Sequence, residues 1–265
     1  MTAFAEISPA QLARLMGLPD CPVLIDLRIE EDFDADPKLL PTATRFTHTD
    51  IDAITDHLQG RPSIVYCQKG RKISQGVAAM LRASGLDCEV LEGGQFAWRD
   101  AGLPLVPVDV IPLTRERGHT LWVTRHRPKI DRIACPWLIR RFVDRDARFL
   151  YVPPSDVALV AEKFGATPFD TDGLGFDHSG ERCSFDTMLD AFDLRTEALD
   201  RLATVIRAAD TDRHELSPQA AGLLAFSVGL SRMHKDDSRQ LEAAMPFYDV
   251  LYRWARDGFA EGHDR

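Results

Sequence analysis

Ser63-Ile-Val-Tyr-Cys67-Gln-Lys-Gly-Arg-Lys-Ile-Ser74 is the segment of this sequence with the clearest structural pattern. Its apolar residues from Ile64 to Tyr66 are β-branched or aromatic, which predicts a short buried strand. Ser74 is a good N-cap, and apolar residues at helical spacing predict a helix from Gly76 to Leu86. We therefore expect Cys67 at the junction between a strand and a helix.

The surroundings of Cys67 favour its ionised form. Backbone N–H groups of such a loop converge on one point, and the following helix adds a partial positive charge. We predict a nucleophilic thiolate at neutral pH, in a loop that also binds an anionic substrate. The loop residues expected to form this site are Gln68, Lys69, Gly70, Arg71, Lys72 and Ile73. The alternative is a buried structural cysteine beside a solvated basic loop.

The spacing after Cys67 argues against a cysteine-based phosphatase or arsenate reductase. Those enzymes need Cys-x5-Arg, because the guanidinium clamps the oxyanion with two hydrogen bonds. The corresponding residue here is Ile73, and the loop would present Arg71 and Lys72 differently.

The first 107 residues resemble rhodanese-type sulfurtransferases. The segments that carry the resemblance are Ile7-Ser8-Pro9 with Gln11–Met16, Val23-Leu24-Ile25-Asp26-Leu27-Arg28, the Cys67 loop, Val90-Leu91-Glu92-Gly93-Gly94 with Trp98, and Ala101-Gly102-Leu103-Pro104. The resemblance implies that Cys67 carries a persulfide. The sulfur would come from thiosulfate or another sulfane donor and pass to a thiol, cyanide or a protein acceptor, without a cofactor in this domain.

Composition narrows the class of protein further. The chain has 265 residues, 45% of them hydrophobic, and a formal net charge of −9, which argues against general affinity for nucleic acids or anionic membranes. The most apolar stretch, residues 220–230, is too short to span a bilayer. Five cysteines without a CxxC pair suit a reducing compartment, and no signal peptide is visible. We expect a cytoplasmic protein.

The order of the expected elements indicates two domains. Strands alternate with helices in residues 1–107, which predicts an α/β rhodanese-like domain with a parallel sheet covered by helices. The acidic stretch Glu30–Asp36 is expected to be a solvated loop. Closely spaced prolines predict an extended, stiff linker at 108–118. Residues 119–265 then predict an α+β domain with a helical C-terminal half.

The second domain opens on a basic span from Arg115 to Arg141, with eight Lys and Arg against Glu116 and Asp131. One interpretation is a solvated basic face around a buried cysteine; the other is a patch that binds oxyanions or nucleic acid. The candidate oxyanion ligands are Arg125, Arg132 and Arg140. Pro136 suits the first turn of a helix, which would place Cys135 near a helix N-terminus and lower its pKa.

A metal site is the second hypothesis for this domain. If the helices carrying Asp186 and Asp210 pack antiparallel, His178 and these carboxylates can share one Fe, Mn or Zn ion, with Cys183 as a fourth ligand. In the rival arrangement Arg207 pairs with Asp186 and makes a metal unnecessary. The spacing alone leaves both open.

Residues 119–258 resemble the C-terminal domain of chromate-resistance protein B. The resemblance rests on Trp122–Arg125, Asp131–Phe142 and His178–Asp186. Many members have Glu at position 186 and His at position 207, so Arg207 weakens the metal hypothesis. The resemblance implies a role in chromate resistance, with chromate or sulfate as ligand. We favour a sulfurtransferase coupled to an oxyanion- or metal-binding domain. The alternative is a chromate-responsive sensor or transcriptional regulator with a non-catalytic rhodanese-like domain, although the acidic charge and the lack of a helix-turn-helix pattern argue against direct DNA binding.

Overall fold

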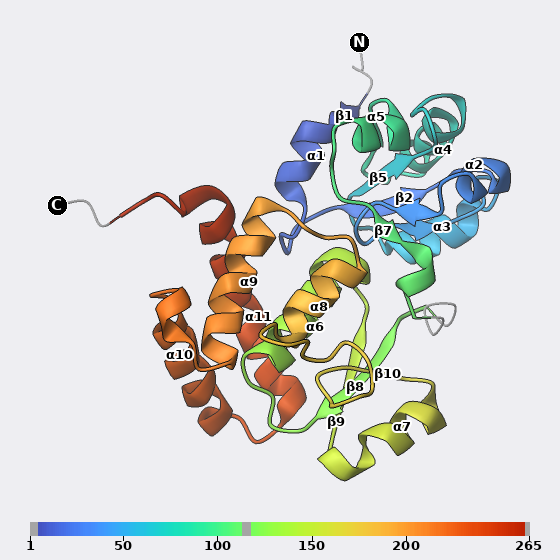
Figure 1. The fold of residues 1–265 in the computed structure, drawn as a ribbon. Coiled ribbons are helices and arrows are strands. Elements are labelled where there is room, and N and C mark those ends of the chain that lie inside the picture. The colour runs from blue at the N-terminus through green and yellow to red at the C-terminus, as the bar shows by residue number, and fades with distance from the viewer. Residues whose placement is uncertain (1–4, 113–117, 263–265) are drawn as a thin grey trace. The chain divides into compact units, whose positions relative to one another are not determined.

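The computed structural model describes residues 5–112 and 118–262, and the chain folds into two compact units (Figure 1). The first unit extends to Val108 and includes the short piece Arg141–Val143, and the second comprises the remainder. Of the predicted linker, Val108–Val110 form a 3-10 helix rather than an extended chain. Arg115, Glu116 and Arg117 of the basic span lie outside the described residues.

The first unit contains a five-stranded parallel sheet of order β1-β6-β5-β2-β4, as expected for an α/β domain. The strands are β1 (Glu6–Ile7), β2 (Val23–Asp26), β4 (Thr44–Arg45), β5 (Ser63–Tyr66) and β6 (Cys88–Leu91). Strands β3 (Lys38–Leu39) and β7 (Val106–Pro107) form a separate antiparallel pair. Asp26 pairs in register with Tyr66, so the residues that follow β2 and β5 leave the sheet at the same edge.

The helices described in this unit are α1 (Pro9–Leu15), α2 (Glu30–Asp34), α3 (Ile51–Leu58), α4 (Lys72–Ala83) and α5 (Gly94–Asp100). Helix α1 begins with a capping box in which Ser8 and Gln11 bond each other's backbone N–H. Ile25, Val65, Val77 and Val90 belong to the buried core between sheet and helices. Branched residues in the strands and small or aliphatic residues at helical spacing supply this core.

Two expectations for the first unit are wrong. The acidic stretch is not a loop, because residues 30–34 form α2 with three acidic residues in its first turn, where they complement the helix dipole. Helix α4 begins at Lys72, and its N-cap is Arg71 rather than Ser74. Ser74 therefore lies in the first turn, where its side chain is fully buried.

The second unit has a small parallel sheet and a helical C-terminal half. Its strands β8 (Leu121–Arg125), β9 (Arg148–Val152) and β10 (Thr167–Pro168) follow the order β10-β8-β9. Val123 packs with Val157 of α7, whereas Trp122 contacts the rings of Phe169 and Phe192. The helices are α6 (Asp131–Leu138), α7 (Val157–Phe164), α8 (Ser184–Ala191), α9 (Glu197–Asp210), α10 (Ala220–Met233) and α11 (Asp237–Arg253).

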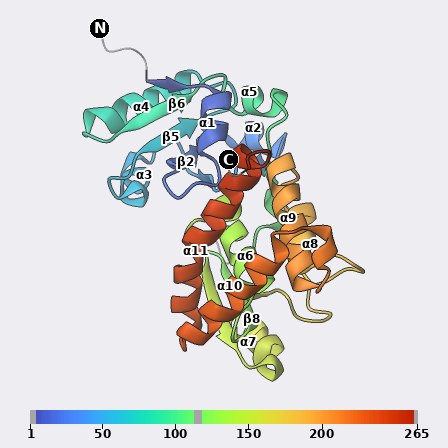
Figure 2. The same ribbon diagram turned by 90° about the vertical axis from the view of Figure 1, so that its left-hand side faces the viewer.

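Shorter helical segments of this unit lie at Pro154–Asp156, His214–Leu216 and Trp254–Gly258, and a further one, Ile139–Val143, includes the piece from Arg141 that belongs to the first unit. Helices α9, α10 and α11 contact one another, and Figure 2 shows α10 beside α11. Helix α6 begins at Asp131, so Pro136 lies inside the helix and not in its first turn as expected. None of the helices in the described part of the chain is long and apolar enough to cross a membrane.

Candidate functional site

The Cys67 loop is fixed by the segment that follows β6. The N–H of Gln95 donates to the carbonyl of Cys67 at 3.0 Å, and the N–H of Phe96 donates to that of Gln68 at 3.1 Å. Gly70 has a φ of +62°, and a Cβ there would lie 2.4 Å from the carbonyl oxygen of Leu91. Glycine is therefore required at this position both for its backbone conformation and for the close approach of the two segments.

The Cys67 thiol is 7% exposed and lies in a hydrogen-bonded setting. Its Sγ is 3.4 Å from Ser74 Oγ and 3.9 Å from the carbonyl oxygen of Arg71. Burial is the largest influence and raises the pKa of this thiol. Hydrogen bonds from the Ser74 side chain and from backbone groups at Ser74, Arg71 and Lys69 outweigh it, so the pKa of Cys67 is lower than that of an ordinary cysteine.

A pocket of about 400 Å³ opens in front of the thiol. It is lined by Asp32, Cys67, Gln68, Lys69, Arg71, Lys72 and Ile73. Of the predicted loop residues, Gly70 does not line the pocket. It is buried against the segment that follows β6. Lys69, Arg71 and Lys72 are exposed, so their positive charges are presented to solvent. A dianion entering this pocket would meet three cations and one carboxylate, that of half-buried Asp32.

Two residues were missed by sequence reasoning at this site. Ser74 was read as a helix cap, whereas its hydroxyl contacts the thiol. Asp32 was assigned to a solvated loop, whereas it lines the pocket. The position of Ser74 could have indicated this contact. In a helix that begins at Lys72, Ser74 is the third residue, and its side chain points back towards Cys67.

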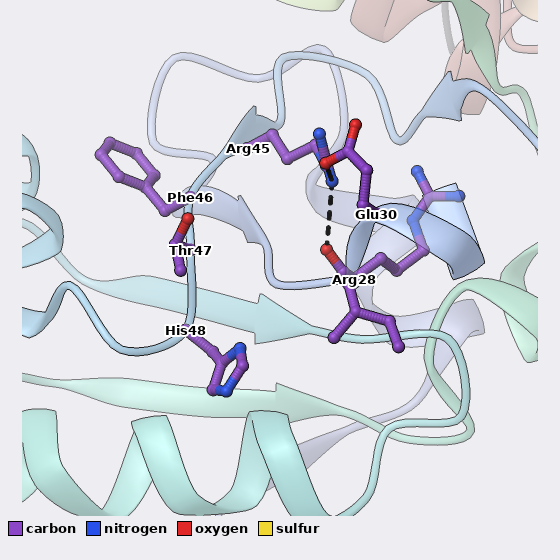
Figure 3. Close-up of a pocket in the computed structure, with 7 residues that line it drawn as sticks. Arg28, Glu30, Arg45, Phe46, Thr47 and His48 are labelled. Carbon is purple, nitrogen blue, oxygen red and sulfur yellow. Dashed lines mark hydrogen bonds and ion pairs between the residues drawn. The ribbon is translucent and has the colours of Figure 1, made fainter. Parts of the chain in front are cut away.

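A second pocket of the same unit, about 390 Å³, lies beside the Asp26–Arg28 pair (Figure 3). Asp26 and Arg28 form a buried ion pair of 2.6 Å, and Arg28 also donates to the carbonyls of Asp36 and Lys38. Figure 3 shows Arg45 between the carbonyl of Arg28 and the carboxylate of Glu30, with which it pairs at 2.7 Å. These contacts hold the chain between β2 and β3, and we assign them a structural role.

In the second unit, three carboxylates converge on one imidazole. His178 Nε2 lies 3.3 Å from Asp131 Oδ2, 3.4 Å from Asp170 Oδ1 and 3.2 Å from Asp210 Oδ2. Asp131 begins α6 shortly after β8, Asp170 follows β10, and Asp210 ends α9. The carboxyl ends of parallel strands meet at one edge of a sheet, which explains why Asp131 and Asp170 lie together although they are far apart in sequence.

The electrostatics of this cluster favour bound protons or a cation. Burial, followed by the neighbouring charge of Asp131, raises the pKa of Asp170 to about 6 and that of Asp210 to about 8. The hydrogen bond to Asp131 raises the pKa of His178 to about 9, against the opposing effect of burial. Carboxylates that share a site repel one another, so a positive charge placed among them stabilises the ionised form of each.

The predicted grouping of His178, Cys183, Asp186 and Asp210 is only partly assembled. His178 and Asp210 meet, but Asp186 instead pairs with Arg207 at 2.8 Å and accepts the N–H of Cys183 at 3.3 Å. Asp186 thus caps α8, and its charge is neutralised by the arginine that the sequence identified as the rival. Asp131 and Asp170 were missed, although each follows a strand of the sheet.

The two thiols of this unit are not activated. Cys183 is fully buried with its Sγ 3.6 Å from Asp186 Oδ2, and burial raises its pKa. Cys135 is also fully buried, and burial together with the nearby Asp131 carboxylate raises its pKa well above the ordinary value. The expectation of a low pKa at Cys135 is wrong because α6 begins four residues before it.

The three candidate oxyanion ligands are engaged by protein acceptors. Arg125 and Arg132 pair with Asp170 at 2.8 and 3.1 Å. Arg140 pairs with Glu242 at 2.6 Å and donates to the carbonyl of Ala147. An oxyanion at these guanidinium groups would have to compete with carboxylates already in place, and its binding there stays a prediction.

A parallel sheet with a cysteine-centred loop between β5 and α4 defines the first unit as a rhodanese-like domain, and residues 8–101 match the profile of the rhodanese-like domain. Residues 122–255, half of the chain, match the profile of the ChrB C-terminal domain. The chain belongs to this ChrB family.

Individual relatives were also found. Protein ChrB of Cupriavidus metallidurans is 31% identical over 196 residues, a match that covers 69% of this chain and 59% of that protein. The chain thus spans less than two thirds of its relative. A rhodanese-related protein from Thermoplasma volcanium is 19% identical with a TM-score of 0.34, over 39% of this chain and 98% of that one. A rhodanese homologue from Thermus thermophilus is 30% identical with a TM-score of 0.28, over 35% and 98%.

Proposed function

We propose that this protein is a sulfurtransferase of the thiosulfate type that forms a persulfide on Cys67. The observation that carries the proposal is a thiol of lowered pKa at the base of a pocket lined by three cations. A thiolate is the reactive form of cysteine, and the cations attract a dianionic donor. Thiosulfate, or another sulfane donor, fits both requirements.

The reaction consists of two displacements at sulfur. The Cys67 thiolate attacks the outer sulfur of thiosulfate, the sulfur–sulfur bond of thiosulfate breaks, and sulfite leaves with the electron pair. Cyanide, a thiol or a protein acceptor then attacks the outer sulfur of the persulfide, and the thiolate departs. The groups that hydrogen-bond Cys67 would stabilise the negative charge of the thiolate before attack and of the persulfide after it.

Replacement of single cysteines tests this assignment. Cys67→Ser should abolish formation of thiocyanate from thiosulfate and cyanide, because a hydroxyl is a far weaker nucleophile at neutral pH. The matched controls are Cys21→Ser, Cys88→Ser, Cys135→Ser and Cys183→Ser. Circular dichroism should show that each variant is folded, and all four should keep most of the activity. Activity retained by the Cys67 variant would refute the assignment.

We also propose that the second unit binds a divalent cation, Fe, Mn or Zn, through Asp131, Asp170 and His178, with Asp210 beside them. One oxygen or nitrogen atom from each of the first three lies within 4.8 Å of the others. Asp131 and Asp170 are almost fully buried, and Asp210 and His178 line the open side of the cluster. Carboxylate oxygens with one imidazole are a donor set that suits these metals.

The balance of charge among these side chains supports the binding of a cation. Arg125 and Arg132 both form ion pairs with Asp170. Asp131 and Asp210 are therefore left to share the His178 ring, which lies between them. A single imidazole Nε2 carries at most one proton and can satisfy only one of these carboxylates at a time. A metal ion would satisfy them together, displacing protons from His178 and Asp210 as it binds.

Metal analysis tests the second proposal. The purified protein should contain about one equivalent of metal per chain, and chelation should lower its melting temperature. Asp131→Asn and His178→Ala should lose the metal, whereas His214→Ala, a half-buried histidine of the same unit, should keep it. A protein that takes up no Fe, Mn or Zn on titration would refute the site.

Membership of the ChrB family suggests the biological role of these proposed activities. We propose a cytoplasmic role in chromate resistance, with chromate or sulfate as ligand of the second unit and without direct nucleic-acid binding. The alternative is a chromate-responsive regulator in which the rhodanese-like domain is not catalytic. Turnover of thiosulfate without retardation of a labelled promoter fragment supports the enzyme; retardation without turnover supports the regulator.

A further inference from the structure

A third pocket, of about 300 Å³, lies where the C-terminal end of α10 approaches the start of α11 and the loop after β8. Its lining residues are Arg127, Ser231, Arg232, His234, Lys235, Asp237 and Gln240. Neither the cysteine loop nor the Asp–His cluster contributes a residue to it.

An unsatisfied hydroxyl lies in the wall of this pocket. Ser231 is only 7% exposed, and its Oγ has no hydrogen-bond partner among the residues that the structure describes. A buried hydroxyl without a partner is costly, and such groups usually bond to the protein, to water or to a ligand. A ligand that reaches this hydroxyl would supply the missing hydrogen bond.

The charge of the pocket indicates the sign of that occupant. Arg127, Arg232 and Lys235 are exposed, and no ion pair to a carboxylate is found for them within residues 5–112 and 118–262. Arg125, Arg132 and Arg140 of the neighbouring basic span all have carboxylate partners. In a chain with 41 acidic and 32 basic residues, three such cations therefore gather around this one pocket.

The one carboxylate in the pocket has a structural task. Asp237 Oδ2 accepts the backbone N–H of Arg127 at 3.0 Å, and Arg127 has a left-handed φ of +54°. The end of a helix such as α10 favours cations through its dipole, and this would explain Arg232. It does not explain Arg127, which comes from a different segment and is held at the same pocket by Asp237.

The walls of the pocket are tied together. Gln240 of α11 donates to the carbonyl of Pro128 at 2.6 Å, and Tyr248 of the same helix donates to that of Ile130 at 2.8 Å. Ser227 of α10 accepts the N–H of Ile130 at 2.9 Å. These bonds fix the loop after β8 against both helices, so little ordering is needed when a ligand binds.

We propose that this pocket binds a small tetrahedral dianion, with Arg127, Arg232 and Lys235 supplying charge and Ser231 Oγ a hydrogen bond. Guanidinium groups donate paired N–H bonds to such oxyanions, and an ammonium adds a point charge. The site does not depend on the sulfurtransferase proposal, because none of its residues belongs to the Cys67 pocket.

Calorimetric titration of the full chain with sodium sulfate, and separately with sodium phosphate, tests the site. Ionic strength is kept constant with sodium chloride. Saturable binding of both anions that Arg232→Ala/Lys235→Ala weakens assigns this pocket to tetrahedral dianions generally, and such binding of one assigns it to that anion. Absence of saturable binding with both anions, together with an unchanged melting temperature, overturns the proposal.

Variants locate the binding. The double variant Arg232→Ala/Lys235→Ala should weaken binding roughly tenfold or more, the effect expected from losing a charge-assisted hydrogen bond. Arg148→Ala, which removes an exposed cation outside the pocket, should bind as the parent does. Equal affinities for all three proteins would place the anion elsewhere and overturn the assignment.

Ser231→Ala separates a ligand-binding role from a purely structural one. It should weaken anion binding while leaving the melting temperature of the free protein unchanged or higher, because a buried unpaired hydroxyl is removed. Unchanged affinity would exclude the hydroxyl from the site. Cys67→Ser should bind the anion as the parent does, so failure of the sulfurtransferase proposal and failure of this one are distinguishable.

Discussion

The contact between Ser74 and Cys67 leads to a quantitative prediction for Ser74→Ala. In the structure the Ser74 hydroxyl donates to the carbonyl of Arg71 at 3.0 Å and lies 3.4 Å from Cys67 Sγ. The hydroxyl has a single hydrogen. When the thiol ionises, this hydrogen can turn from the Arg71 carbonyl to the sulfur, so that one hydrogen bond is exchanged for a stronger one.

The magnitude follows from this exchange. A hydrogen bond to a charged group contributes about 1.5–3 kcal/mol and a neutral one about 1 kcal/mol. The net stabilisation of the thiolate by Ser74 is therefore about 0.5–2 kcal/mol, or roughly 2- to 30-fold in the thiol–thiolate equilibrium. Ser74→Ala should raise the pKa of Cys67 and reduce kcat/KM for thiosulfate at neutral pH by a similar factor.

The assay must follow the thiolate independently of turnover. The rate of alkylation of Cys67 by iodoacetamide, measured against pH in a variant that lacks the other four cysteines, reports ionisation of this thiol alone. The alkylation profile of Ser74→Ala should move to higher pH, and activity at high pH should approach that of the parent. Ser84→Ala, an exposed serine after the same helix, is the matched control and should leave both unchanged.

Two results would contradict a role of Ser74 in ionisation of Cys67. An unchanged alkylation profile in Ser74→Ala would mean that the hydroxyl does not stabilise the thiolate. A loss of activity that persists at high pH, where the thiolate is fully formed in both proteins, would mean that Ser74 acts on geometry rather than on ionisation.

The remaining predictions concern backbone, charge and domain structure. Gly70→Ala should destabilise the protein by about 2 kcal/mol or more in urea unfolding, because the added Cβ would meet the Leu91 carbonyl. Gly76→Ala, the control, has open space around a helical position and should stabilise the protein by about 0.5–1 kcal/mol. Equal effects of the two substitutions would contradict the steric argument. In the presence of a chelator, stability should fall as pH rises from about 4 through 9. The pKa of Asp210 is raised from 3.8 to about 8 and that of His178 from 6.5 to about 9, so the contribution of each group is complete below its unfolded pKa and is lost as pH rises through its folded pKa. Asp210→Asn should flatten this slope, and an unaltered slope would show that Asp210 does not hold a proton. A fragment ending near Val108 should fold and keep sulfurtransferase activity, since its sheet and loop lie before the boundary; an unfolded fragment from a stable chain would show one integrated unit.

The sequence alone determined the fold of the first unit and the residue at its centre. Strands such as residues 63–66 are short, apolar and β-branched, and the glycines and cations of the loop are contiguous with Cys67. Contiguity matters because a strand, a loop and a helix start are set by neighbouring residues. The parallel arrangement of the sheet also followed from the alternation of strands and helices.

In the second unit, the residues that share a site could be identified only from the three-dimensional structure. Asp131, Asp170 and Asp210 are separated by 39 and 40 positions in the sequence, and the edge of a parallel sheet and the end of α9 bring them together around His178. Asp186 and Arg207 were both visible in the sequence, but their pairing depends on α8 beginning beside the last turn of α9. Side-chain partners across such distances are chosen by packing, which one-dimensional spacing does not encode.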